Sequence, residues 1–447
     1  MEKEMEISRE ILLKYPLCDS CLGRQFGLLG FGLDNKTRGE SIKTVLVLES
    51  YKNFIKDKTS KNDLALLEAI AINGMSEFAR NSLKKLGFTH EKSEKKCFLC
   101  ERLLEKKNLL KFVSNAIEKL KNLEFQTFLV GSVIKSDLIE KEDTLRATYN
   151  ISWGEALKSE LNRLIGIMIK EKMNKETDLA NPEIVILVKP NENNVEIKIN
   201  PLFISGKYCK LERNIPQTLW ICKNCDGQGC DECGGTGKRY ETSVSELISE
   251  KILQKTQGTD TKFHGAGRED IDALMLGSGR EFVIEIKEPK KRYFDLKKLE
   301  EEVNDFAKGK IKVINLQKSD KDKIRRIKAF AQFSEKTYKI IVELDSSIPR
   351  SKLDEVEKYF SGITIKQRTP TRVLHRRADK TRVKKIFALK INILEKKLIE
   401  LIIKTQGGTY IKELVSGDDG RTKPSISEFL NMKLVCKSLD VLSVEEK

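Results

Sequence analysis

Hydrophobic spacing divides the chain into helical and extended stretches. From about residue 40 to residue 120, apolar side chains recur every three to four positions between lysines and glutamates, most regularly over residues 60–85 and 103–120. Such a period places the apolar residues on one face of an amphipathic helix. The N-terminal part of the chain is therefore expected to be largely helical.

The pattern then changes to short apolar runs that predict strands. Residues 125–134, 183–188 and 195–199 are rich in Val, Ile, Leu and Phe, and the polar turn at residues 191–194 is expected to join the last two as a hairpin. A helical period over residues 153–173 follows the first strand. Helix and strand alternate in this way within an α+β module.

A second α+β region follows a glycine- and cysteine-rich segment. It is expected to contain a helix near residues 244–254 and strands near residues 281–285, 310–316, 337–344 and 398–405. At 447 residues the chain is too long for one small core. We therefore predict a multidomain α+β protein with an N-terminal region (1–205), a cysteine- and glycine-rich insert (206–240) and a C-terminal domain (241–447).

The charge of the chain indicates a polyanionic partner. Lys and Arg number 83 against 67 Asp and Glu, which gives a net charge of +16, and a hydrophobic content of 39% is adequate for folded cores. A folded protein this basic usually meets nucleic acid, although a plain lysine-rich surface is the competing explanation. The acidic N-terminus has no secretory signal, and no apolar run approaches the roughly 18–20 residues that span a bilayer. We expect no membrane association and a cytoplasmic location.

Eight of the ten cysteines form four Cys-x-x-Cys pairs, which are Cys18/Cys21, Cys97/Cys100, Cys222/Cys225 and Cys230/Cys233. Two such pairs supply the four thiolates of a tetrahedral zinc site, whereas a reducing cytosol disfavours disulfides. If the first two pairs share an ion, they hold the start of the chain against a later segment. Glycines that follow the last two pairs leave backbone amides free to point at the sulfurs. Structural zinc is the expected occupant, and a thioredoxin-like redox role is the weaker alternative.

The segment from Gly265 to Asp272 carries the first candidate for catalysis. Its glycines permit a tight turn and a close approach to a ligand, and Arg268 stands two residues before Asp270. A positioned carboxylate can act as a nucleophile or a base on a sugar or a base ring. The ordinary alternative is a turn at the start of a strand with a surface salt bridge.

Two further segments suit contacts with nucleic acid. Residues 366–385 hold nine Lys or Arg and one Asp, and they are expected to form a basic loop that contacts phosphates. Paired glycines end the strand near residues 398–405, after which Tyr410 and Ile411 can present a flat, apolar face to a base, with Lys412 beside them. A tyrosine buried in a core turn is the alternative for Tyr410.

Three stretches resemble the three motifs of pseudouridine synthases, in the same order. Gly267–Asp270 resembles the Gly-Arg-x-Asp motif that carries the catalytic aspartate, and Lys336–Tyr338 resembles the Lys-x-Tyr strand. Gly408–Lys412 resembles the Gly-Thr-Tyr-Ile-Arg strand beneath the active site, with Lys in place of the usual Arg.

The whole chain is similar to the archaeal and eukaryotic class of tRNA pseudouridine synthase that bears an N-terminal THUMP-containing domain, and the cysteine cluster at 222–233 resembles the archaeal form. Further segments that fit this class are Cys18–Arg24, Ile215–Thr218, Arg372–Arg377 and Gly420–Pro424.

This resemblance implies an isomerase that converts uridines 54 and 55 in the T-loop of tRNA to pseudouridine. It implies a zinc-bearing, THUMP-like tRNA-binding region before a catalytic domain with a mixed, mainly antiparallel sheet. Nothing in the sequence demands more than a monomer, so a monomer is expected. Asp270 would be the nucleophile, by attack at the sugar C1′ or through a glycal, and no catalytic cofactor is expected. Lys412 would orient Asp270, and Tyr338 would stack on the uracil and help to remove its C5 proton. The substrate-binding residues implied are Arg268, Tyr338, Arg372, Arg376, Arg377, Tyr410, Ile411 and Lys412.

Two other classes of protein share parts of the pattern. A zinc-bearing RNA-binding protein without catalysis is the main alternative, because the second cysteine cluster also resembles the zinc region of DnaJ chaperones. THUMP-containing methyltransferases and thiolation enzymes would need a nucleotide or methyl-donor loop such as Gly-x-Gly-x-x-Gly. The candidate loops at Gly265–Gly267 and Gly277–Gly279 lack the third glycine.

Overall fold

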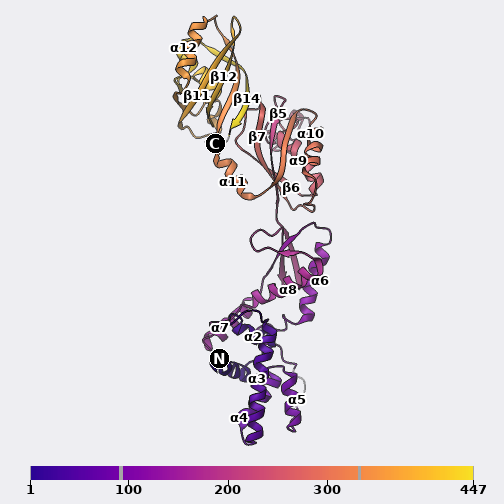
Figure 1. Cartoon of the computed structure of the whole chain (residues 1–447). Coiled ribbons are helices and arrows are strands. Elements are labelled where there is room, and N and C mark those ends of the chain that lie inside the picture. Colours follow the sequence, from indigo (N-terminus) through magenta and orange to yellow (C-terminus); the bar gives the residue numbers. More distant parts are fainter. Residues whose placement is uncertain (1, 90–93, 331–333, 446–447) are drawn as a thin grey trace. The chain divides into compact units, whose positions relative to one another are not determined.

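The computed structural model describes residues 2–89, 94–330 and 334–445, and the side chain of Arg376 lies outside the described part. The chain forms two compact units, Met1–Asn200 and Pro201–Lys447 (Figure 1). Buried apolar side chains between Ile11 and Val195 form one core, and those between Ile204 and Val441 form another. Among the described residues, no helix has the length and the apolar character that crossing a membrane requires.

The first unit begins with helices and ends with a small sheet. Its helices are α1 (Glu2–Lys14), α2 (Asp19–Gly23), η1 (Arg24–Phe26), α3 (Asn35–Lys56), α4 (Lys61–Ile72), α5 (Glu77–Lys85), α6 (Lys106–Leu120), α7 (Ser136–Thr148), α8 (Leu157–Met173) and η2 (Pro190–Glu192). Its strands are β1 (Thr127–Ser132), β2 (Glu176–Thr177), β3 (Ile184–Lys189) and β4 (Asn194–Ile199).

The sheet of the first unit has the strand order β2-β1-β3-β4. Strand β1 pairs in parallel with β2 and β3, whereas β3 and β4 form the antiparallel hairpin that the sequence predicted. Helices α6 and α8 pack together on this sheet (Figure 1). In α8, buried Leu161, Ile165 and Ile169 recur every fourth residue, which places them on the helix face toward the core.

The second unit is built on a ten-stranded sheet with short helices around it. Its strands are β5 (Leu202–Lys210), β6 (Asp260–Gly265), β7 (Leu274–Lys287), β8 (Ile311–Ser319), β9 (Glu335–Leu344), β10 (Thr364–Arg368), β11 (Thr381–Glu395), β12 (Leu398–Gln406), β13 (Thr422–Lys423) and β14 (Leu434–Glu445). Its helices are η3 (Asp231–Cys233), α9 (Val244–Thr256), α10 (Leu296–Phe306), α11 (Lys321–Phe330), α12 (Arg350–Phe360), η4 (Thr371–Arg376), α13 (Ile411–Ser416) and α14 (Ile426–Leu430).

Strand order in this sheet is β13-β10-β11-β12-β9-β14-β7-β5-β8, and β6 also pairs with β7. Neighbouring strands are antiparallel except β14 and β7, which are parallel. The predicted mixed, mainly antiparallel sheet is therefore confirmed. The last strand of the chain, β14, lies between β7 and β9 and joins the two halves of the sheet.

Helices cover both faces of the sheet half that contains β5, β7 and β8. Helices α9 and α10 lie side by side on one face (Figure 1), where α9 packs on β7 and α10 on β8. Phe282 and Ile284 of β7 belong to the same buried core as these helices. Val283 points to the opposite face because side chains alternate along a strand, and there it packs with Ile324 and Ile327 of α11. Helix α12 packs on β11 in the other half.

Three sequence expectations differ from the structure. The boundary expected at residues 205 and 206 falls inside β5, because this strand pairs with β7 and β8 of the second unit. The basic segment 366–385 is not a single loop: β10 and β11 pair antiparallel, with Gln367 opposite Arg382, and η4 lies between them. The third motif is not a strand either. Strand β12 ends at Gln406, and Ile411–Ser416 forms α13 because Ile411, Leu414 and Val415 share one buried helix face.

Candidate active site and metal centres

A cleft of about 840 Å³ in the second unit collects the site residues that the sequence singled out. Its lining comes from the loop between β6 and β7, from β9, from η4 and β11, and from the segment between β12 and α13. The predicted residues that line it are Arg268, Asp270, Tyr338, Arg372, Arg377, Tyr410, Ile411 and Lys412. The side chain of Arg376, also predicted, is outside the described part of the chain.

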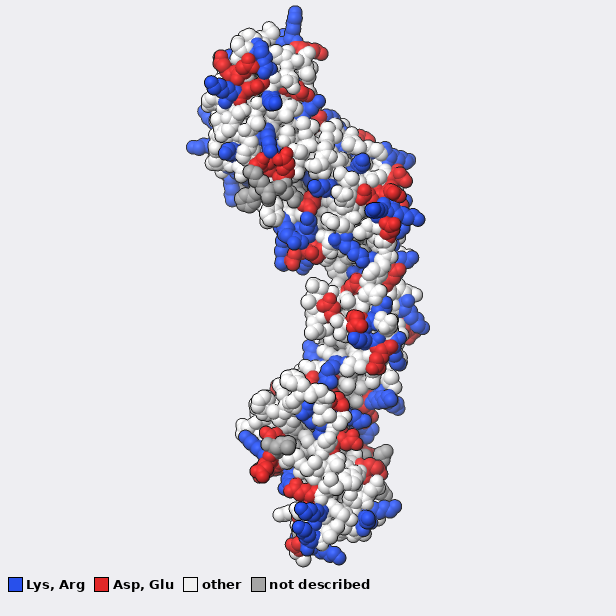
Figure 2. All heavy atoms as spheres, in the orientation of Figure 1, with Lys and Arg blue, Asp and Glu red and all other residues white. Residues whose placement is uncertain are grey.

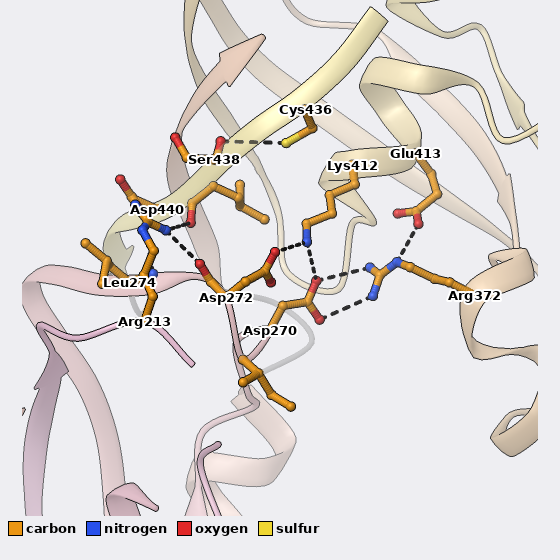
Figure 3. Close-up of polar contacts among 12 residues, drawn as sticks. Arg213, Asp270, Asp272, Leu274, Arg372, Lys412, Glu413, Cys436, Ser438 and Asp440 are labelled. Atoms are coloured by element: carbon orange, nitrogen blue, oxygen red, sulfur yellow. Dashed lines mark hydrogen bonds and ion pairs between the residues drawn. The ribbon is translucent and has the colours of Figure 1, made fainter. Parts of the chain in front are cut away.

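Asp270 lies in this cleft between two cations (Figure 3). The guanidinium of Arg372 contacts both carboxylate oxygens, with Nη1 3.3 Å from Oδ1 and Nη2 3.2 Å from Oδ2. The same guanidinium donates from Nε to Oε1 of Glu413 at 2.7 Å. Burial acts to lower the pKa of Arg372, but the bonds to Glu413 and Asp270 raise it above its ordinary value. The carboxylates of Glu413 and Asp270 therefore hold the permanently charged guanidinium of Arg372 in place.

Lys412 bridges the two aspartates of the loop. Its Nζ lies 2.7 Å from Oδ2 of Asp272 and 3.8 Å from Oδ2 of Asp270 (Figure 3). Lys412 projects from the first turn of α13, so its position depends on the helix that replaced the expected strand. The sequence suggested Lys412 as the ionic partner of Asp270, whereas the closer cation is Arg372, which was expected among the phosphate contacts.

Tyr338 and a group of apolar side chains line another part of the cleft. Tyr338 lies on β9, opposite Val441 of β14 and Ile403 of β12, and is 8% exposed. Burial, which the positive charge of Arg280 partly offsets, raises the pKa of Tyr338 to about 12, so its phenol is neutral near pH 7. Val441 and Ile411 also line the cleft. A planar ring beside apolar walls suits a nucleobase.

Tyr410 and Arg377 occupy the rim of the cleft. The Tyr410 hydroxyl accepts a hydrogen bond from Nη1 of Arg377 at 3.2 Å, and Gln367 holds the Tyr410 backbone at both its amide and its carbonyl. Ile411 is only 4% exposed and packs mainly in the core, so its contribution to a base-binding face is small. Arg268 is exposed in the cleft.

Several residues in or beside the cleft were given no role from the sequence. Glu413, the second anchor of Arg372, stands directly after the third motif, and Lys336 begins the second one. Burial, together with the nearby Arg280 charge, lowers the pKa of Lys336 to about 7. Other cationic residues in the lining are Arg280, Lys328, Arg382 and Lys384. A cleft so rich in cations suits a phosphate backbone. Elsewhere, on the face in Figure 2, Lys and Arg are interleaved with Asp and Glu over both units.

The first cysteine cluster joins segments far apart in the first unit. The sulfurs of Cys18, Cys21, Cys97 and Cys100 all lie within 4.8 Å of one another, and those of Cys18 and Cys100 are 3.8 Å apart. Four thiolates that are each ~2.3 Å from a zinc ion form a tetrahedron with edges of roughly 3.8 Å. The donor set and its spacing therefore fit zinc, as the sequence predicted.

The second cluster gathers Cys222, Cys225, Cys230 and Cys233, again within 4.8 Å of one another. Sulfur–sulfur distances of 3.9 Å join Cys222 to Cys230 and Cys225 to Cys233. The backbone amides of Gly229 and Gly237 donate to Cys225 and Cys233, so the expectation that glycines direct amides at sulfurs is confirmed. Amide donation from Cys230 is the largest influence that lowers the pKa of Cys233 to about 6, and the thiolate is the form that binds metal. This cluster too can hold zinc.

Comparison with known families assigns both units. Residues 203–445 match the family described as Pus10, C-terminal, and residues 112–189 match the Pus10 THUMP domain, archaeal. The archaeal character of the sequence is thus confirmed.

Named proteins match over most of their length. The protein named tRNA pseudouridine synthase Pus10 from Methanocaldococcus jannaschii is 41% identical over 451 residues, which cover 99% of this chain and 95% of that protein. The protein of the same name from Methanosphaera stadtmanae is 43% identical over 364 residues, 78% of this chain and 88% of that protein. Among solved structures, a chain of a Cbf5-Nop10-Gar1 complex is 14% identical and covers 54% of this chain and 48% of its own, but its TM-score of 0.30 is too low to support a conclusion. The chain belongs to the Pus10 family of tRNA pseudouridine synthases, which are isomerases, as its three sequence motifs predicted.

Proposed function

We propose that this chain converts uridine to pseudouridine at positions 54 and 55 in the T-loop of tRNA, with Asp270 as the nucleophile. The observation that carries this assignment is the place of Asp270 in a cleft rich in cations, where Arg372 and Lys412 hold its carboxylate and Tyr338 also lines the wall. Relatives that match nearly the whole chain are named tRNA pseudouridine synthases, which supports both the reaction and the substrate.

The reaction is an internally balanced isomerisation. In the addition route, a carboxylate oxygen of Asp270 bonds to C1′ while the bond between C1′ and N1 breaks, and the electron pair leaves with the uracil. The uracil turns, its C5 bonds to C1′, and Asp270 is released; C5 then loses its proton, and N1 finishes with one. In the glycal route, Asp270 instead removes the proton from C2′, which returns after C5 has bonded. Neither route requires a redox partner, so we assign no catalytic cofactor.

The other cleft residues have distinct roles in this scheme. Arg372 and Lys412 stabilise the negative charge on Asp270 and fix its direction. Tyr338 stacks on the uracil, and because its pKa is raised to about 12 we assign the ring a larger role than its hydroxyl. The nucleotides around the target are bound by Arg268, Arg377 and Tyr410 and by the basic segment that includes Arg376. Ile411 makes a smaller contribution.

We assign the remaining parts of the chain to tRNA binding and to structural metal sites. We assign tRNA binding to the THUMP-like region within residues 1–205, and zinc to both cysteine clusters. All four coordination positions in each cluster are thiolates, which is typical of structural zinc rather than of a catalytic ion with an open position. The enzyme in this scheme acts as a monomer, because one chain contains every residue of the proposed site. We propose a cytoplasmic location for it.

A set of tRNA transcripts tests the substrate assignment. Unmodified tRNA and three variants, with cytidine at position 54, at position 55 or at both, are incubated with the protein, and pseudouridine is mapped along each transcript. We expect pseudouridine at both T-loop positions in the first transcript, at one in each single variant, and at neither in the double variant. Pseudouridine elsewhere in the tRNA only would contradict the T-loop assignment. Binding of all four transcripts without any modification would favour a non-catalytic RNA-binding protein.

A further inference from the structure

Glu269, next to Asp270, is among the residues that line the cleft, but its carboxylate is bound by buried side chains of the protein. The Glu269 side chain is fully buried, whereas that of Asp270 is 31% exposed. Both oxygens of Glu269 accept hydrogen bonds from the hydroxyl of Tyr208, at 3.0 and 2.9 Å, and Oε2 also accepts one from Nε of Arg280 at 2.9 Å. Tyr208 and Arg280 are themselves buried. One carboxylate thus joins the loop to β5 and β7.

The backbone of the same loop is held by further side chains. Nη1 of Arg280 donates to the carbonyl oxygen of Ala266 at 2.9 Å. Nε2 of Gln217 donates to the carbonyl oxygen of Gly267 at 2.9 Å and to the Tyr208 hydroxyl at 2.8 Å. The amide of Gln217 therefore belongs to the same network as the Glu269 carboxylate.

Lys210 and Arg213 extend this network to Asp270 and the residues after it. Nζ of the buried Lys210 donates to the carbonyl oxygens of Asp270 at 3.1 Å and of Ile271 at 2.9 Å. Nη1 of Arg213 donates to the carbonyl oxygen of Asp272 at 2.7 Å. Four donors between residues 208 and 217 therefore reach the loop, in addition to Arg280.

The loop needs such support because its own sequence is permissive. Gly267 has φ of +81°, and Gly265 lies two residues before it. Glycine accepts many backbone conformations, so local sequence does not select the one that aims Asp270 into the cleft. A buried ion pair is also a poor source of stability, because the desolvation of both charges offsets much of their attraction. The pair of Glu269 and Arg280 is therefore better explained by the conformation that it imposes.

We propose that Glu269 is the central positioning residue of the active site, which fixes the catalytic loop through Tyr208 and Arg280 so that the Asp270 carboxylate meets its target atom. This inference rests on the proposed role of Asp270. A displacement of about 1 Å in a reacting group can slow a reaction on the order of a hundredfold without any change in substrate binding.

Glu269→Gln tests this inference, because glutamine keeps the size of the side chain and removes its charge. The measurements are the single-turnover rate of pseudouridine formation at saturating tRNA, the dissociation constant for tRNA and the midpoint of thermal unfolding. We expect the rate to fall about 30- to 100-fold, with the dissociation constant within about threefold of wild type. A rate within about threefold of wild type would overturn the inference.

Glu357→Gln is the matched control. Glu357 on α12 is partly buried, with its side chain 23% exposed, and pairs with Arg350 at 2.8 Å, but it does not line the cleft. Its substitution makes the same chemical change and is expected to leave the rate unchanged, even where it lowers the unfolding midpoint.

Tyr208→Phe keeps the test decisive if Glu269→Gln does not fold, because it removes one hydroxyl and no charge. We expect a rate loss on the order of tenfold, and an unchanged rate would overturn the inference. Where both variants fold, the double variant should lose no more than Glu269→Gln alone, since the two residues share one interaction. Asp270→Ala separates the two proposals. If the Asp270→Ala variant stays active, the assignment of Asp270 as the nucleophile fails. If Asp270→Ala is inactive while Glu269→Gln and Tyr208→Phe keep the wild-type rate, the positioning role of Glu269 fails.

Discussion

Arg372 and Asp270 are 102 residues apart in the sequence, yet Nη2 of Arg372 lies 3.2 Å from Oδ2 of Asp270. The contact joins η4, between β10 and β11, to the loop between β6 and β7, so both halves of the large sheet must be in place before it forms. Glu413 of α13 holds the other edge of the same guanidinium. The position of the proposed nucleophile thus depends on three separate segments of the second unit.

Arg372→Lys should impair catalysis more than tRNA binding. Lysine keeps the charge, but it cannot contact both oxygens of Asp270 and Glu413 together as the planar guanidinium does. We expect the single-turnover rate at saturating tRNA to fall on the order of tenfold or more, with a change in tRNA affinity of less than about threefold. A variant with wild-type rate would show that Arg372 does not orient Asp270.

Lys412→Met should have a smaller effect than Arg372→Met. Nζ of Lys412 lies 3.8 Å from Oδ2 of Asp270, whereas its closest contact, at 2.7 Å, is with Oδ2 of Asp272. Because Coulomb attraction weakens with distance and with exposure to solvent, Arg372 should contribute more than Lys412 to stabilising and orienting the Asp270 carboxylate. The two single-turnover rates compared side by side decide the order, and a larger loss with Lys412→Met would reverse the roles assigned here.

Tyr338→Phe should retain most activity, whereas Tyr338→Ala should lose it. Phenylalanine preserves a ring that can stack on uracil, and base stacking is worth roughly 1–3 kcal/mol per base. Since burial raises the pKa of Tyr338 to about 12, with the charge of Arg280 only partly offsetting it, little phenolate is present near pH 7 to act as a base. Single-turnover rates of both variants test this. If Phe is as inactive as Ala, the hydroxyl takes part in proton removal.

Lys336→Met should change how stability depends on pH. Burial and the neighbouring Arg280 lower the pKa of Lys336 to about 7 in the folded protein, whereas an unfolded lysine titrates near ~10.4. Between these values the unfolded state binds more protons, so a rise in pH stabilises the folded state, by up to a few kcal/mol in total. The cost of the buried charge is greatest below pH ~7 and disappears as pH approaches ~10.

Urea unfolding of wild type and Lys336→Met at several pH values checks this sign. The wild-type free energy of unfolding minus that of the variant should rise between pH ~7 and ~10. Lys339→Met is the control, because Lys339 lies on the same strand with its side chain 40% exposed, so its substitution removes no buried charge. A flat difference for Lys336→Met would contradict a lowered pKa.

Loss of one cysteine from either cluster should remove one zinc ion. We expect two zinc ions per wild-type chain, one in Cys97→Ser and one in Cys225→Ser, measured by elemental mass spectrometry. Cys97→Ser should also lower the thermal midpoint strongly, because its cluster is buried in the core of the first unit. Cys436→Ser, outside both clusters, is the control and should retain two ions. Equal zinc content in all four proteins would refute the assignment of the clusters.

Local patterns predicted much of the fold. Helical spacing predicted α6 and α8, and alternating apolar runs predicted β3, β4, β9 and β12, because these elements bury one face with a regular period. The pattern failed where long-range pairing decides the outcome. Strand β14 lies between β7 and β9, which precede it by at least 90 residues in the chain, and no local period identifies such partners. The third motif was expected as a strand, but the buried face of Ile411, Leu414 and Val415 makes it a helix.

The sequence likewise predicted only some of the residues of the candidate site. Asp270, Tyr338 and Lys412 could be identified because they stand in short motifs, and all three line one cleft. The pairing of Arg372 with Glu413 could not, since a run of basic residues suggests phosphate contacts and does not reveal which arginine turns inward. The buried contact of Glu269 with Tyr208 joins residues 61 positions apart, and Glu269 occupies the unspecified position of the first motif. Motifs identify the reacting groups, whereas the groups that hold them appear only after folding.

The most direct test of Asp270 as the nucleophile of a T-loop pseudouridine synthase is a pseudouridine map of unmodified tRNA transcript. Wild-type protein and Asp270→Ala are compared, with tRNA binding measured for both. We predict pseudouridine at positions 54 and 55 with wild type, none with Asp270→Ala, and similar tRNA affinity for the two proteins. Pseudouridine formation by Asp270→Ala, or none by a wild-type protein that binds the transcript, would contradict this assignment.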